Sequence, residues 1–307
     1  MKIVADKKSL LELTLPDGGS FACTNIDDAY QFCQKIAKAH YENFPVGSIL
    51  IPRHTRKYFY SVYAFARIAD DIADELAFSD TEQRVFALQS FLGILDSTDE
   101  STLTNPIAMA VRDTMKIKVI PIEPFEKLIK AFISDIRFVQ PATFHESLSY
   151  CSNSANPIGE LVLRLFGEYN PQTKLFSEAI CTGLQLVNFW QDISVDVPNG
   201  RIYIPKDICN KHSLDFSDFP NNIDDKNFEK SLAEIYNFTN NFFSFGKNLI
   251  NCLISKRLKL EIAITFESGL KMLEKLRKLE INVIHKRVTL NKGDFPTILF
   301  RAIRNHF

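Results

Sequence analysis

The chain has 307 residues, of which 46% are apolar and 24% charged, and its formal net charge is −1. This length and composition allow a large core, in one helical domain or two smaller ones, and the near-neutral charge disfavours nucleic acid as the main partner. The six cysteines show neither CxxC nor Cys/His ligand spacing, which argues against zinc or disulfides and favours a reducing cytoplasm. Without a signal peptide or an apolar run of about 18 residues, we expect neither export nor a membrane span.

Apolar residues recur with helical periodicity along most of the chain, and the alternation typical of strands is missing. We therefore predict an all-α fold, with an irregular segment over 1–25 that contains a Pro-Asp-Gly-Gly turn, and a single helical domain over 26–307. Helices are predicted at 27–43, 53–76, 81–96, 104–116, 122–138, 144–168, 172–196, 226–252, 257–287 and 295–307.

Between residues 197 and 227 the helical pattern stops, and the segment is rich in Pro, Asn, Asp and Ser. We predict a long loop with at most one short helix. Such a loop is either a functional lid or a disordered connection, and its place directly after an acidic cluster favours the lid. Arg201 and Lys206 on this loop would either close over a phosphate or remain solvated.

Two acidic clusters about 120 residues apart, RIADDIADE and NFWQDISVD, are the most informative motifs of the chain. Each contains two aspartates at i and i+4, Asp70 with Asp74 and Asp192 with Asp196, which places both carboxylates on the same face of a predicted helix. Like charges at this spacing destabilise a helix, so the pairs suggest bound cations.

Other polar residues extend each pair into a stripe along an otherwise apolar helix. The stripes consist of Tyr63, Arg67, Asp70 and Asp74, and of Gln185, Asn188, Asp192 and Asp196. We predict that both helices are buried nearly all round. Charges there require ion pairs or metal ions, and the alternative is a set of exposed acids on an amphipathic helix. Carboxylate and amide oxygens suit Mg²⁺ that also binds phosphate, so we favour a diphosphate held by Mg²⁺.

Two further segments could contribute. Tyr150 and Asn156 lie in YCSNSANPIGELVLRLFG, where Asn156 is either a polar wall of the site or part of a turn before Pro157. From Lys256 onward the chain has twelve Lys/Arg against five Asp/Glu, a net charge of +7. This basic end would either contact an anionic membrane surface, on the inner face of the membrane, or form the solvated face of packed helices.

These residues resemble the squalene/phytoene synthase family over about 27–290, on the segments YAFARIADDIADE, YCSNSANPIGELVLRLFG and GLQLVNFWQDISVDVPNGRIYIP. The resemblance implies a helical bundle of the isoprenoid synthase type with a central apolar cavity. It also implies ionisation of an allylic or cyclopropylcarbinyl diphosphate by two or three Mg²⁺ ions. The metal ligands would be Asp70, Asp74, Asp192 and Asp196. The residues near the diphosphate or the reacting carbons would be Tyr63, Arg67, Tyr150, Gln185 and Asn188, with Asn156, Gln191, Arg201 and Lys206 contacting substrate.

One subgroup is especially similar: the bacterial hydroxysqualene synthases, which convert presqualene diphosphate and water to hydroxysqualene and diphosphate without NADPH. They work beside a presqualene diphosphate synthase and a flavin-dependent reductase. Two positions depart from the wider family. Glu42 replaces a lysine that would bind diphosphate, and Gln191 replaces an arginine before the second acidic motif. We hypothesise that the less cationic wall at Gln191 allows a water molecule to be captured.

Three alternatives remain. The first is a condensing squalene, dehydrosqualene or phytoene synthase that acts on farnesyl or geranylgeranyl diphosphate. The second is a head-to-tail prenyl synthase, because DDIAD fits a DDxxD motif, although the second cluster lacks that pattern. The third is a catalytically silent assembly or interaction protein of the same fold, against which all four acidic positions argue.

Overall fold

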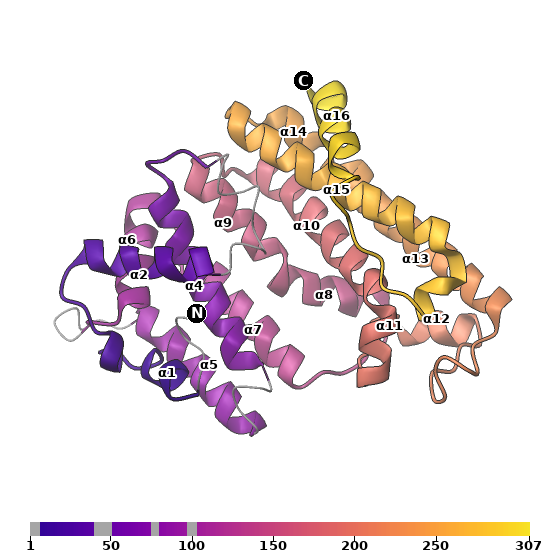
Figure 1. The fold of residues 1–307 in the computed structure, drawn as a ribbon, viewed down its shortest axis with the longest axis horizontal. Coiled ribbons are helices and arrows are strands. Elements are labelled where there is room, and N and C mark those ends of the chain that lie inside the picture. The colour runs from indigo at the N-terminus through magenta and orange to yellow at the C-terminus, as the bar shows by residue number, and fades with distance from the viewer. Residues whose placement is uncertain (1–6, 40–50, 75–79, 97–102) are drawn as a thin grey trace. The chain divides into compact units, whose positions relative to one another are not determined.

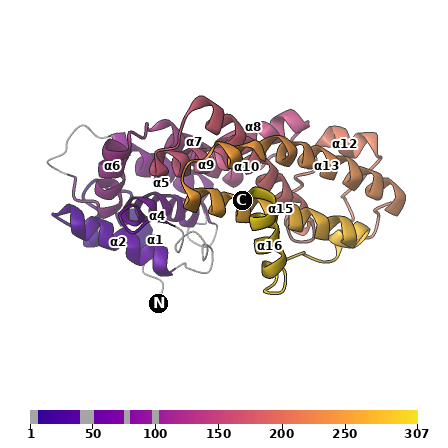
Figure 2. The ribbon, with the colours of Figure 1, turned by 90° about the horizontal axis from the view of Figure 1, so that it is seen from above.

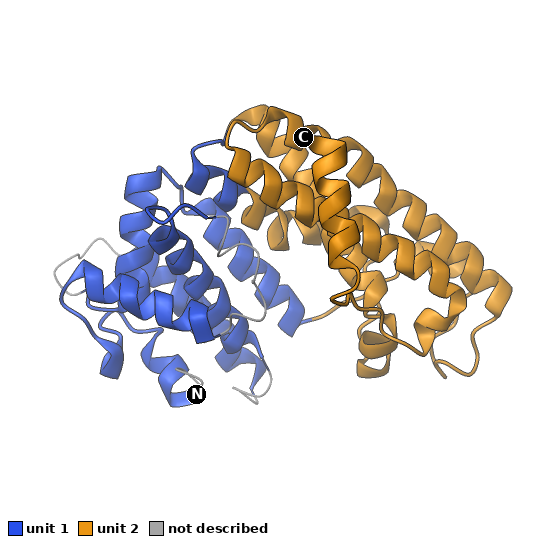
Figure 3. Cartoon of the chain, turned by 45° about the horizontal axis from the view of Figure 1, so that its top comes forward, with its two compact units in different colours: residues 1–137, 160–169 blue, residues 138–159, 170–307 orange. Residues whose placement is uncertain are grey.

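A computed structural model describes residues 7–39, 51–74, 80–96 and 103–307, and in these ranges all regular secondary structure is helical (Figure 1). The predicted all-α class is therefore confirmed. None of the helices in these ranges carries an apolar stretch of the length needed to cross a bilayer. The described residues group into two compact units, 1–137 with 160–169, and 138–159 with 170–307 (Figure 3). The single domain over 26–307 stays a prediction.

Unit 1 is built around α4 (Arg56–Ala73), which packs against α2 (Ile26–Ala39), α5 (Thr81–Asp96), α6 (Pro106–Lys118) and α7 (Glu123–Ile136). The core side of α4 presents Phe65, which is fully buried. Its ring stacks on that of Phe91 at a centroid distance of 4.8 Å and meets the edge of Phe125 at 5.1 Å. Large apolar residues three and four apart therefore fix one face of α4 in the core and leave the opposite face polar.

The N-terminal segment is more regular than predicted, because α1 (Lys7–Glu12) and a short 3-10 turn (Gly19–Phe21) lie within it. The prediction of an irregular segment is therefore wrong for residues 7–12, which form a helix. The predicted turn is confirmed, since Gly18 and Gly19 both have positive φ. The buried amide of Asn105 holds the segment in place: its nitrogen donates to the carbonyls of Leu13 (2.7 Å) and Leu15 (2.9 Å), while its oxygen caps α6.

Unit 2 is built around α10 (Pro171–Gln191), which packs against α8 (Phe144–Ser154), α13 (Asp225–Gly246) and α15 (Lys256–Leu279). The indole of Trp190 is fully buried, and its Nε1 donates to Thr239 Oγ1 on α13 at 2.8 Å. Gly269 lets α15 approach closely, because a Cβ there would lie 2.8 Å from the Phe243 ring on α13. The remaining helices are α11 (Ile193–Asp196), α12 (Lys206–Lys211), α14 (Asn248–Cys252) and α16 (Phe295–His306).

Several long predicted helices are interrupted. The stretch predicted as 144–168 is two helices, α8 and α9 (Asn156–Phe166), because Pro157 has no N–H to donate to the preceding turn. The stretch predicted as 172–196 ends at Gln191 and resumes as α11. Likewise, α14 follows a break at Lys247 and a 3-10 turn (Glu280–Ile284) follows α15. The segment predicted as a loop over 197–227 contains α12, a 3-10 turn (Val197–Asn199) and the first turn of α13, and its role as a lid stays a prediction.

Candidate active site

The first acidic cluster lies at the C-terminal end of α4 in unit 1. Arg67 donates from Nη1 to Asp70 Oδ2 at 3.1 Å and from Nε to Asp71 Oδ2 at 3.3 Å, with a second, shorter bond from Nη2 to Asp71 Oδ1. Burial opposes the charge on Arg67, but Asp71 and then Asp70 outweigh it, so the pKa of Arg67 is raised. The guanidinium is therefore held in place as a permanent cation.

Two predictions for this cluster need correction. The stripe of α4 is not buried, since the side chain of Asp70 is 56% exposed. Asp74 does not continue the helix either: it caps α4 with extended dihedrals (φ −64°, ψ 134°), and the preceding carbonyl of Ala73 accepts from buried Arg84 on α5 at 3.1 Å. Asp71, which the sequence analysis did not assign, is the main partner of Arg67. Tyr63 lies half-buried on the same helix.

The second acidic cluster belongs to unit 2. Gln185, Asn188 and Gln191 lie on the last turns of α10, of which Asn188 is exposed and the other two are half-buried. Asp192 caps α10 with non-helical dihedrals (φ −100°, ψ 9°), which is why the predicted continuous helix is wrong here. The backbone N–H of Asp196 still donates to the Asp192 carbonyl at 2.7 Å, so the two carboxylates remain one turn apart.

The electrostatics of this pair favour a cation. Burial, and then the neighbouring Asp192, raise the pKa of Asp196 to about 6, and Arg201 and Arg287 offset this only in part. Arg201 also donates its backbone N–H to the Asp196 carbonyl at 2.9 Å. Arg287, which the sequence analysis missed, pairs with Asp192 through Nε and through Nη2 (3.2 Å to Oδ2). In the sequence, only the position of Arg287 in the basic C-terminal end could have pointed to this role.

Tyr150 and Asn156 both pack against α10. The Tyr150 ring lies 5.7 Å from that of Phe189, which stacks on Tyr203 of the predicted lid at 4.0 Å. Asn156 Oδ1 accepts from Thr182 Oγ1 at 3.1 Å, one turn before Gln185. Unit 2 thus gathers an aromatic row and several amides along the helix that leads to Asp192.

Lys206 lies farther along the predicted lid, as the first residue of α12. Its backbone N–H donates to the carbonyl of Pro141 at 2.9 Å, which fixes the start of this helix, and its side chain is exposed. The departure at Glu42 lies outside the described residues. The roles of all the predicted site residues stay predictions.

The donor set fits a hard divalent ion. Across the described ranges no three His, Cys, Asp or Glu side chains are grouped to hold a metal. In each cluster two aspartates are the predicted ligands, and Mg²⁺ commonly uses one or two carboxylates together with water and phosphate oxygens. The raised pKa of Asp196, caused by burial and then by Asp192, means that its charged form is only partly compensated, and this is a second reason that a cation fits the pair in unit 2.

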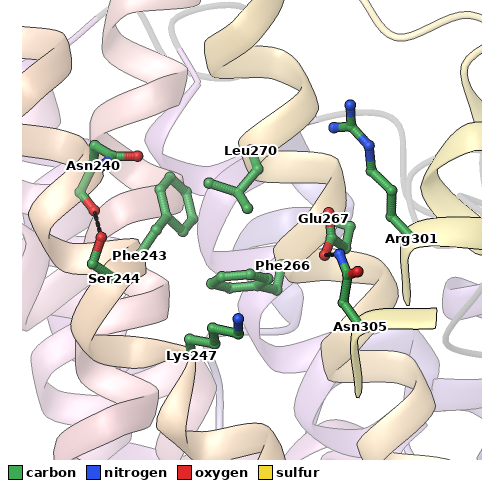
Figure 4. A pocket seen from close by; sticks show the side chains of 9 residues that line it. All are labelled: Asn240, Phe243, Ser244, Lys247, Phe266, Glu267, Leu270, Arg301 and Asn305. Carbon is green, nitrogen blue, oxygen red and sulfur yellow. Dashed lines mark hydrogen bonds between the residues drawn. The ribbon is translucent and has the colours of Figure 1, made fainter. Parts of the chain in front are cut away.

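A pocket of about 310 Å³ in unit 2 is distinct from these residues. It lies between α13, α15 and α16, and Figure 4 shows Phe243, Phe266 and Leu270 in its apolar part with Asn305 hydrogen-bonded to Glu267 at its side. None of the predicted site residues lines it. The central apolar cavity implied by the resemblance is therefore a different feature and stays a prediction.

Comparison with known proteins identifies the family. A sequence model of the squalene/phytoene synthase family matches residues 37–294. The chain belongs to the squalene/phytoene synthase family. Among curated members, the phytoene synthase of Mycobacterium tuberculosis is 34% identical over 185 residues, which is 60% of each chain. The chain thus spans 60% of the length of the mycobacterial phytoene synthases that it matches. The hydroxysqualene synthase of Rhodopseudomonas palustris is 31% identical over 269 residues, 85% of this chain and 88% of the relative.

Solved structures in the squalene/phytoene synthase family share this fold. The squalene synthase HpnC from Alicyclobacillus acidocaldarius has a TM-score of 0.77 at 30% identity, covering 88% of this chain and 98% of that one. A dehydrosqualene synthase in complex with ligand has a TM-score of 0.75 at 19% identity, covering 91% and 97%. The predicted family and the all-α isoprenoid synthase fold are both confirmed.

Proposed function

We propose that this chain is an enzyme that converts presqualene diphosphate and water to hydroxysqualene and diphosphate. The observation that carries the proposal is coverage: the relative named hydroxysqualene synthase from Rhodopseudomonas palustris aligns over 85% of this chain and 88% of its own length. A second, from Zymomonas mobilis, aligns over 85% and 86% at 28% identity. The reactions before and after it would be a presqualene diphosphate synthesis and a flavin-dependent reduction.

Asp70, Asp74, Asp192 and Asp196 would hold Mg²⁺ on the two clusters. The bound Mg²⁺ would supply Lewis-acid stabilisation of the departing diphosphate. Arg67, kept charged and oriented by Asp70 and Asp71, adds a fixed positive charge where the diphosphate gains negative charge. Tyr63 on the same helix would contact the diphosphate.

The residues of unit 2 would act on the hydrocarbon part of the substrate. The Tyr150–Phe189–Tyr203 row presents aromatic faces that stabilise positive charge on carbon and exclude bulk water. Gln185 and Asn188 would orient the reacting carbons, with Asn156 behind them. Arg201 and Lys206, on the segment that carries Tyr203, would contact substrate as this lid closes.

We connect Gln191 with the step in which water captures the carbocation. Gln191 is the last residue of α10 and half-buried, and it places a neutral amide where a cation would disfavour a nearby carbocation. Replacing Gln191 by Arg should lower the yield of hydroxysqualene from presqualene diphosphate. Gln172→Arg, at the exposed start of the same helix, is the matched control. An unchanged yield in Gln191→Arg would remove the idea.

The reaction itself is tested by incubating the protein with presqualene diphosphate and Mg²⁺ in the absence of reductant. We expect hydroxysqualene and one equivalent of diphosphate, and no turnover of farnesyl diphosphate alone. Intact presqualene diphosphate would refute the proposal.

The second candidate is a condensing phytoene synthase, which the 34% identity to the mycobacterial enzymes favours. Such an enzyme would consume geranylgeranyl diphosphate and release diphosphate, and its product would carry no hydroxyl group derived from water. Parallel incubations with farnesyl and geranylgeranyl diphosphate therefore separate the two candidates.

A further inference from the structure

The C-terminal helix α16 has an exposed apolar face made of Phe300, Ile303 and Phe307, called the outer face below. These side chains are 59%, 51% and 60% exposed, and their spacing of three and four residues places them on one side of the helix. The other side of α16 packs against α15 (Figure 2), where Arg301 pairs with Glu274 at 2.6 Å and His306 Nε2 lies 3.0 Å from Glu267.

Cations lie directly over the rings of the outer face. The Arg304 guanidinium carbon is 5.3 Å from the centroid of the Phe300 ring, and Lys259 Nζ on α15 is 5.2 Å from that of Phe307. The helix α16 contains no acidic residue, and the first turn of α15 adds Lys256 and Arg257 beside Lys259. The outer face is therefore apolar in its middle and basic along its edge.

We propose that the outer face binds the surface of an anionic lipid bilayer. Aromatic and aliphatic side chains on one side of a short helix, bordered by Lys and Arg, are the arrangement by which helices lie in a membrane interface. The rings would enter the boundary between headgroups and acyl chains. Arg304 and Lys259 have long side chains that can leave the rings and extend to lipid phosphates.

A second copy of the chain fits this face less well. In a two-fold symmetric dimer this face meets its own copy, so one basic edge would lie against another basic face, with no acid on α16 to compensate the cations. Vesicle binding by the outer face is measured without substrate, so its outcome is independent of the reaction that the chain catalyses.

The test is flotation of the full chain with vesicles of phosphatidylcholine alone or mixed with phosphatidylglycerol, at low and at high ionic strength. We expect binding to the anionic vesicles only, weakened by salt. The variant Phe300→Ser/Ile303→Ser/Phe307→Ser should lower the partition coefficient roughly ten-fold or more. The variant Lys259→Gln/Arg304→Gln should lose roughly five-fold per cation at low ionic strength.

Matched controls come from exposed residues elsewhere. Phe86→Ser on α5 removes an aromatic ring that is 71% exposed, and Lys226→Gln/Lys230→Gln removes two exposed cations of α13. Both should bind vesicles as the unmodified chain does. The proposal is overturned if the unmodified chain stays unbound, or if the outer-face variant binds equally well. It is also overturned if sedimentation velocity shows a dimer that this variant abolishes.

Discussion

Arg287 donates two hydrogen bonds to the carboxylate of Asp192, from a position 95 residues later in the chain. This pairing brings the segment after α15 to the end of α10, at the acidic pair that we assign to Mg²⁺. An arginine on a metal-binding carboxylate competes with the ion for the same oxygens.

Replacing Arg287 by Gln should therefore tighten divalent-ion binding in unit 2. Loss of one neighbouring positive charge at a partly exposed site is worth about 1 kcal/mol, or roughly five-fold in affinity. Titration with Mn²⁺, followed by electron paramagnetic resonance, measures the change. Lys286→Gln, an exposed neighbour, should leave the affinity unaltered. Equal affinities in both variants would show that Arg287 does not compete with the ion.

Each of the four proposed metal ligands should be needed for turnover but not for folding. Asp→Asn at Asp70, Asp74, Asp192 or Asp196 should lower the rate of diphosphate release by about a hundred-fold or more. The midpoint of thermal unfolding should stay within a few degrees of the unmodified value, since these side chains lie at helix ends and surfaces. Asp225→Asn, at an exposed first turn of α13, serves as the control. Full activity in any of the four variants would remove that residue from the ligand set.

Arg67 should be coupled more strongly to Asp71 than to Asp70. The Asp71 side chain is 17% exposed and takes two bonds from the guanidinium, whereas Asp70 is 56% exposed and takes one. Double-mutant cycles with Arg67→Gln, read from urea unfolding, should give about 1 kcal/mol with Asp71→Asn and below about 0.5 kcal/mol with Asp70→Asn. The reverse order would contradict the geometry.

Replacement by alanine should change the free energy of unfolding in opposite directions at two helical glycines. In α15, a Cβ on Gly269 would lie 2.8 Å from Phe243 and 2.7 Å from Leu184, so Gly269→Ala should lower the free energy of unfolding by about 1–3 kcal/mol. In α5, nothing lies within 4 Å of a Cβ on Gly93, so Gly93→Ala should raise it by about 0.5–1 kcal/mol. Urea midpoints at constant m-value decide both.

Deprotonation of Glu261 on α15 should lower the free energy of unfolding as the pH rises. Burial raises its pKa from 4.5 to about 7, and within the described part of the chain its Oε2 is buried without a hydrogen-bond partner. Between these two values the folded state retains a proton that the unfolded state has lost, so the free energy of unfolding decreases until about pH 7.

The variant Glu261→Gln isolates this effect from other titrating groups. It should match the unmodified chain near pH 4.5 and exceed it by about 1–3 kcal/mol above pH 7. Urea unfolding across this pH range gives both curves. Glu229→Gln, at an exposed position of α13, is the matched control. A constant difference at all pH values would exclude titration of Glu261 as its cause.

Periodicity predicted where helices occur, because the apolar faces that repeat every three to four residues are the faces that the core requires. It did not predict where they stop. Asp74 and Asp192 both look helical in sequence, yet each caps a helix, and their dihedrals depend on contacts from other segments, such as that of Arg84 with Ala73.

Local sequence was least informative about partners that are distant in the chain. Arg287 reaches Asp192, and Asn105 orders Leu13 and Leu15, across separations of about 90 residues or more. Neither contact leaves a local pattern. The pairing of Asp71 with Arg67 is predictable from sequence, because the two residues are at i and i+4, the spacing at which helical ion pairs form.

Both compact units are discontinuous, since 160–169 complete unit 1 and 138–159 begin unit 2. On the ribosome, residues 138–159 emerge before the last part of unit 1, and also before α10 and α13, against which α8 folds. Unit 1 therefore cannot finish folding until residue 169 has left the exit tunnel, and α8 stays without its partner until α10 follows. Synonymous codons that change the speed of translation after residue 169 would alter the yield of folded protein.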